Sequence, residues 1–93
     1  MRLPGTLVII MGEVILVFRI LPDDMENFDQ IKKDLGKLKP DRLEEEPIAF
    51  GLKALKFTKI VEDGEGAVDK VEDALGKVDN VKEVETIAVS RGL

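Results

Sequence analysis

The feature that most restricts the fold of this chain is an apolar run near its start, residues 13–21, which reads EVILVFRIL. Its residues alternate between two faces, one with Val14, Leu16, Phe18 and Ile20 and the other with Ile15, Val17 and Arg19. A period of two predicts a β-strand. Because most of both faces are apolar, a central strand whose second face is at least partly covered is favoured over an exposed edge. Pro22 is expected to end the strand.

Two aspartates and an apolar stripe follow this strand. Asp23 and Asp24 have side chains that can cap the N-terminus of a helix. Apolar residues then recur at steps of three and four: Met25, Phe28, Ile31, Leu35 and Leu38. This spacing predicts an amphipathic helix that buries one face, and we expect Gly36 and Pro40 to help end it.

The rest of the chain predicts two strands, a second helix and a final strand. Residues 43–47 are interpreted as a short edge strand or extended link, because Pro47 cannot donate a hydrogen bond inside a sheet. Residues 51–61 are predicted to form a long second strand of the core. A helical stripe follows a turn at residues 62–66: Val68, Val71, Leu75 and Val78. In the last strand, residues 81–90, alternation predicts Val84, Thr86 and Ala88 on one face and Glu85, Ile87 and Val89 on the other.

The predicted order is therefore strand, helix, strand, strand, helix, strand. This order consists of two strand–helix–strand units. With right-handed crossovers the two units give an α+β, ferredoxin-like βαββαβ sandwich, with a four-stranded antiparallel sheet and both helices on one face. Ninety-three residues make a single domain. We expect that domain to span residues 11–93, and residues 1–10 to be an upstream extension or a disordered start, since Met11 could be the natural first residue.

Composition excludes several classes of function. The chain has 14 basic and 19 acidic residues, a net charge of −5, so its average field repels nucleic acid and anionic lipid. It has no Cys and no His, which removes thiolate and imidazole metal ligands, a Cys nucleophile and the usual neutral-pH base. Glu44, Glu45 and Glu46 are consecutive, so they point to alternating faces and suit edge protection better than catalysis. We expect no enzymatic activity, cofactor, metal, membrane contact or direct nucleic-acid binding.

Phe50 is the candidate for a protein contact. Pro47 stiffens the entry to its segment, and Gly51 beside it permits unusual backbone dihedrals. A rigid aromatic side chain held at the mouth of a sheet suits an interface hot spot. The pattern fits an ordinary core residue at the head of a strand about as well, so both interpretations remain open at this point.

Three segments resemble the archaeal elongation factor 1-beta family: MGEV at residues 11–14, EEPIAFGL at residues 45–52, and the pair Ala54 and Leu55. The resemblance extends from Met11 to the end of the chain, and the PIAFGL block is its specific part. It implies a cytoplasmic, monomeric guanine nucleotide exchange factor that promotes GDP release from elongation factor 1-alpha in translation. Such a factor acts without covalent chemistry.

The resemblance also implies where the partner is contacted. One set of residues surrounds the Phe-Gly pair: Pro47, Ala49, Phe50, Gly51 and Lys53. The other set is at the carboxy terminus: Ser90, Arg91 and Leu93. Arg91 stands one residue away from the penultimate lysine of eukaryotic relatives. Whether its planar guanidinium replaces that ammonium at the GTPase's magnesium site stays open.

The alternative function is a small-ligand-sensing regulatory domain of the same ferredoxin-like topology. Such a module usually dimerises through its sheet and has a glycine-rich first loop. The first loop here begins with Pro22, Asp23 and Asp24 and offers no glycine, so this hypothesis ranks second.

Overall fold

A computed structural model of the chain describes residues 12–62, 64 and 66–91. The boundary expected at Met11, and the expectation for residues 1–10, lie outside these residues. The elements follow in the order β1 (Glu13–Pro22), η2 (Met25–Asn27), α1 (Phe28–Gly36), β2 (Arg42–Pro47), β3 (Lys53–Glu62), α2 (Ala67–Gly76) and β4 (Val81–Arg91). The predicted sequence of elements is confirmed.

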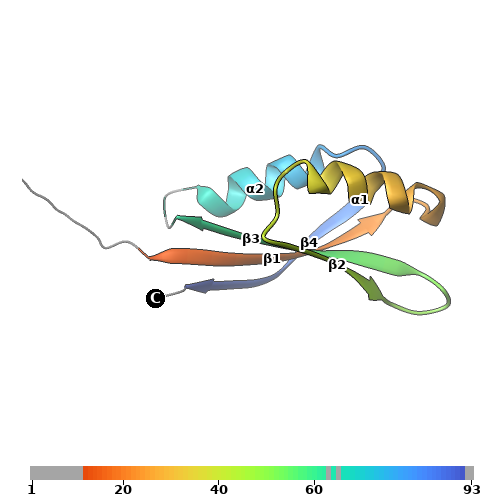
Figure 1. Cartoon of the computed structure of the whole chain (residues 1–93), viewed down its shortest axis with the longest axis horizontal. Helices are drawn as coiled ribbons and strands as arrows, with labels where there is room; N and C mark the ends of the chain where they lie inside the picture. The colour runs from red at the N-terminus through yellow and green to blue at the C-terminus, as the bar shows by residue number, and fades with distance from the viewer. Residues whose placement is uncertain (1–11, 63, 65, 92–93) are drawn as a thin grey trace, which may run out of the picture.

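The four strands form one antiparallel sheet in the order β2-β3-β1-β4. Strand β1 is central, as its two apolar faces predicted, and β2 is an edge strand. Both helices lie on one face of the sheet and leave the other face open (Figure 1). The ferredoxin-like fold class is thereby confirmed.

The hydrophobic core lies between the helices and the sheet. It consists of buried apolar side chains from β1, α1, β3 and α2: Val14, Leu16, Phe18, Ile20, Phe28, Ile31, Leu35, Leu55, Phe57 and Leu75. The face of β1 that carries Val14, Leu16, Phe18 and Ile20 is the one that faces the helices. Its other face, with Ile15, Val17 and Arg19, is partly exposed.

The first helix begins as its sequence predicted and ends slightly earlier. The backbone N–H of Glu26 donates to a carboxylate oxygen of Asp24 at 2.9 Å, which caps the 3-10 turn η2 that leads into α1. The α-helix ends at Gly36, whereas the apolar stripe continues to Leu38. Leu38 nevertheless packs against the core from the segment that follows.

The alternation predicted for β4 was wrong beyond Thr86. Thr86 pairs with Phe18, but Ala88 pairs with Val17, so Ile87 is an extra residue in a β-bulge. Ala88 therefore lies on the open face, the face of Val17 and not that of Thr86. Side chains on either side of a bulge no longer follow one period of two, and a sequence pattern does not show where a bulge occurs.

The sheet is long, and its two ends carry different segments. At one end β2 and β3 close their hairpin with the pair Pro47 and Lys53. At the other end Glu62 pairs with Glu13, and Arg91 pairs with Val14. The ten residues of β3 span about 30 Å between these ends, and Figure 1 shows the hairpin and the end of β4 at opposite ends of the molecule.

Candidate partner-binding site at the β2–β3 turn

The turn between β2 and β3 holds Phe50 and Gly51 at its centre. The N–H of Leu52 donates to the carbonyl of Ala49 at 2.8 Å, and the N–H of Ile48 donates to the carbonyl of Leu52 at 2.9 Å. Phe50 has a φ of 53° and Gly51 a φ of 78°. Positive φ at both central residues is the requirement of a type I′ turn, which matches the twist of a two-stranded hairpin.

The conformation of Phe50 is strained, and no described residue packs against its side chain to compensate for the strain. Type I′ turns prefer Asn followed by Gly, because the left-handed region costs other L-residues roughly 1–2 kcal/mol. The Phe50 side chain is 100% exposed, so it gains no burial in return. The interpretation of Phe50 as a core residue was therefore wrong. A strained, fully exposed aromatic residue is an observation that points to function rather than to stability.

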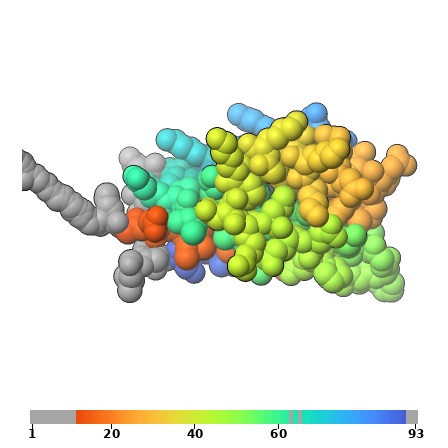
Figure 2. Space-filling model, in the orientation of Figure 1, coloured from red at the N-terminus to blue at the C-terminus, as the bar shows by residue number. Residues whose placement is uncertain are grey.

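The turn presents an apolar surface, which we call the turn patch: Ile48, Phe50 and Leu52. Ile48 and Leu52 are each 50% exposed. A cleft of about 220 Å³ adjoins the patch, and its apolar lining includes Leu21, Pro22 and Met25 from the end of β1 and the start of η2. Figure 2 shows the hairpin at the same end of the molecule as the segment that follows β1. Exposed apolar residues gathered in this way are typical of protein interaction sites.

Lys53, at the base of the turn, belongs to a cluster on the helix face of the sheet. Its Nζ lies 3.1 Å from a carboxylate oxygen of Glu45 and 4.9 Å from the centre of the Phe28 ring. Lys32 of α1 binds the other oxygen of Glu45 at 2.8 Å. Hydrogen bonds from Lys32 and then Lys53 lower the pKa of the Glu45 carboxyl. Lys53 therefore lies beside the turn patch, but its charge is already engaged within the molecule.

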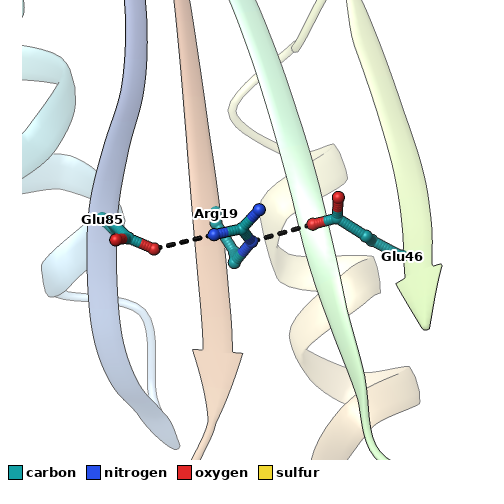
Figure 3. Close-up of polar contacts among 3 residues, drawn as sticks. All are labelled: Arg19, Glu46 and Glu85. Atoms are coloured by element: carbon teal, nitrogen blue, oxygen red, sulfur yellow. Dashed lines mark hydrogen bonds and ion pairs between the residues drawn. The ribbon is translucent and has the colours of Figure 1, made fainter. Parts of the chain in front are cut away.

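A second cluster occupies the open face at the same level of the hairpin. Arg19 of β1 donates from Nε to Glu46 of β2 at 2.8 Å and from Nη1 to Glu85 of β4 at 3.0 Å (Figure 3). The hydrogen bond from Arg19 lowers the pKa of Glu46. In turn, the hydrogen bonds to Glu46 and, with a smaller effect, to Glu85 raise the pKa of Arg19. This cluster ties three strands together across the surface of the sheet.

The structure brings together one of the two predicted sets of contact residues. Pro47, Ala49, Phe50 and Gly51 are exposed in or beside the turn, with Lys53 at its base. The other set lies elsewhere: Ser90 is exposed near the end of β4, opposite Ile15, and the backbone of Arg91 pairs with Val14. Leu93 lies outside the described residues. The described residues of the two sets therefore lie at opposite ends of the sheet.

Sequence reasoning missed two parts of this site. Ile48 and Leu52 were not singled out, although their place on either side of the Phe-Gly turn was a usable signal. The cluster of Arg19, Glu46 and Glu85 gave no such signal, because its members are far apart in the sequence and meet only through strand order and register.

Neither a metal site nor a membrane span is found within the described part of the chain. No group of three or more acidic, His or Cys side chains there is placed to hold a metal ion. In residues 12–62, 64 and 66–91, no helix is long and apolar enough to cross a membrane.

The sequence is similar to known proteins over most of its length. Residues 15–91 match the family model described as the EF-1 guanine nucleotide exchange domain. Elongation factor 1-beta of Thermoplasma acidophilum is 37% identical over 86 residues, which cover 86% of this chain and 98% of that protein. The elongation factors 1-beta of Desulfurococcus amylolyticus and Halobacterium salinarum are 38% and 39% identical and cover 87% of this chain and 98% and 99% of their own lengths. The chain belongs to the family of EF-1 guanine nucleotide exchange domains and is an exchange factor of translation elongation.

Proposed function

We propose that this protein promotes GDP release from elongation factor 1-alpha by binding that GTPase with the turn patch. The observation that carries the proposal is Phe50, which is fully exposed and held in a left-handed conformation. The hydrogen bonds of the turn fix the backbone of Phe50 before binding, so little backbone entropy is lost when a partner covers the ring. Pro47, Ala49, Gly51 and Lys53 shape the turn and its base.

The factor works through coupling between two binding equilibria rather than through covalent chemistry. It binds the nucleotide-free GTPase more tightly than the GDP-bound form. By reciprocity, its binding lowers the affinity of the GTPase for GDP by the same factor. A tenfold weakening requires about 1.4 kcal/mol of coupling. Contacts by exposed apolar side chains are sufficient for free energies of this size.

Ser90, Arg91 and Leu93 are the second proposed contact, which rests on the resemblance to eukaryotic relatives. The backbone register separates Ser90 from the turn by nearly the whole of β3, about 30 Å. One GTPase that binds both sets must therefore lie along the length of the sheet. In this proposal Arg91 approaches the magnesium and phosphate region of the GTPase with a guanidinium in place of an ammonium.

The test is the release of fluorescent GDP from the cognate elongation factor 1-alpha, measured with and without this protein. We expect the release rate to rise with the concentration of the factor and to saturate. Gel filtration distinguishes the alternative function, because a ligand-sensing module would form a dimer that added GTPase leaves unchanged. No acceleration of GDP release, together with such a dimer, would refute the proposed function.

A further inference from the structure

The β2–β3 hairpin separates from the rest of the sheet before it reaches the turn patch. The last pair between β1 and β3 is Ile20 with Leu55, whereas β2 and β3 remain paired as far as Pro47 and Lys53. The cleft of about 220 Å³ lies between the end of β1 and this projecting part of the hairpin. Figure 1 shows the hairpin diverging from the end of β1. The direction in which Phe50 is presented therefore depends on how the base of the hairpin is held.

Two neighbouring glutamates lie at that base, and their side chains are bound on opposite faces. Glu45 pairs in register with Leu55 and Glu46 with Ala54, the positions where β1 leaves β3. On the helix face, Glu45 is bound by Lys32 of α1 at 2.8 Å. On the open face, Glu46 is bound by Arg19 of β1 at 2.8 Å. Figure 3 shows this second contact passing across β3, which lies between the two residues.

These contacts act on an edge strand of the sheet. Among the described residues β2 pairs with β3 alone, so its end can separate from β3 without disturbing the remainder of the sheet. Arg19 reaches past β3 and fastens β2 to the central strand, while its other nitrogen is held by Glu85 of β4. Lys32 fastens the same part of β2 to α1. Opening of the hairpin at this end must therefore break the contacts of Glu45 with Lys32 and Lys53 on the helix face and the contact of Glu46 with Arg19 on the open face.

We propose that Glu46, together with Glu45, is a positioning residue that fixes the hairpin and thereby places Phe50 for the GTPase, an inference that rests on the proposed function. Phe50 is four residues beyond Glu46, in the turn that closes the hairpin. Isolated surface ion pairs contribute little to global stability. At the base of a projecting hairpin, however, contacts on both faces restrict its direction, and restriction before binding reduces the ordering cost of association.

The test compares Glu46→Gln with Glu44→Gln. Both changes remove one negative charge from the same face of β2, but Glu44 makes no ion pair with another described residue. Amide hydrogen exchange of Ile48 and Leu52, measured by NMR on the free protein, reports opening of the turn, because both amides donate within it. For Glu46→Gln we expect exchange about two- to fivefold faster at these amides. Glu44→Gln should leave them unchanged.

The second measurement is GDP release as a function of factor concentration. Glu46→Gln should raise the half-saturating concentration about two- to fivefold and leave the maximal release rate and the melting temperature nearly unchanged, because only the placement of the contact is loosened. Arg19→Lys keeps the charge but loses the guanidinium fork, so a smaller effect in the same direction is expected.

Two results would overturn the positioning role. Unchanged amide exchange with weaker GTPase binding would mean that Glu46 contacts the partner itself. Equal effects of Glu46→Gln and Glu44→Gln would mean that net charge, rather than the contact with Arg19, is responsible. The amide measurement requires no GTPase, so it stands or fails independently of whether Phe50 proves to be the partner contact.

Discussion

Replacement of Phe50 by Asn should stabilise the protein and weaken its activity at the same time. In the folded chain Phe50 has a φ of 53° and is fully exposed, so the ring contributes no burial while its backbone is strained. Asn followed by Gly51 is the preferred pair of a type I′ turn. Relief of the left-handed conformation is expected to add about 1 kcal/mol to the free energy of unfolding. In a domain of this size that raises the melting temperature by about 4–8 °C.

The opposite sign is expected for binding. Full burial of a Phe side chain on a partner contributes about 1.5–3 kcal/mol. Loss of about 2 kcal/mol raises the dissociation constant of the factor for its GTPase about 30-fold. Chemical and thermal denaturation give the stability, and the concentration dependence of fluorescent GDP release gives the affinity.

Two further variants serve as controls. Phe50→Tyr keeps the ring and the strain, so its stability and exchange activity should both stay close to those of the unchanged protein. Phe50→Ala removes the ring but relieves less strain than Asn, so activity should fall with little change in stability. A loss of stability in Phe50→Asn would show that the ring packs inside the protein. Full exchange activity in the same variant would show that the ring is not the contact.

Three other perturbations have defined expectations. Gly51→Ala should lower the free energy of unfolding by about 1 kcal/mol, because Gly51 has a φ of 78°; urea denaturation measures this, and no change would contradict the turn geometry. Leu16→Ala should cost about 2–5 kcal/mol by the same measurement, since Leu16 is fully buried between sheet and helices; a loss below 1 kcal/mol would be inconsistent with that core. Acid should loosen the hairpin, because the pKa values of the Glu45 and Glu46 carboxyls are lowered from 4.5 in the folded protein. The ion pairs of these two carboxylates stabilise the hairpin fully above pH 4.5. This stabilisation is lost as the pH falls through the lower pKa values of the folded protein. Amide exchange of Leu52 against pH checks this, and protection that stays constant down to pH 2 would refute it.

The fold was predictable because its main signals are local. The two apolar faces of residues 13–21 predicted a central strand, and the stripes beginning at Met25 and Val68 predicted the helices. Their order then left few alternatives, since right-handed crossovers restrict the topology. The bulge at Ile87 was not predictable, because one extra residue in a strand leaves the apolar composition unchanged while it reverses the faces that follow.

The site was predictable only in its position along the chain. Pro47 and Gly51 marked a turn around Phe50, but the choice between a buried and an exposed ring depended on backbone dihedrals that no pattern of residue types specifies. The contact of Arg19 with Glu46 depends on a side chain that crosses an intervening strand. Its partners are 27 residues apart in sequence, and only the order of the strands makes them neighbours.

The length of β3 has a consequence for how this family can change over time. If the turn patch and the carboxy-terminal residues engage one GTPase, β3 acts as a ruler whose ten residues match two docking points on that molecule. Insertion of one residue would move the side chains beyond the insertion to the opposite face of the sheet. Insertion of two residues would keep each side chain on its face but would lengthen β3 by about 7 Å. Either change would leave one docking point out of reach, so the span of this strand should vary less than that of the loops around it.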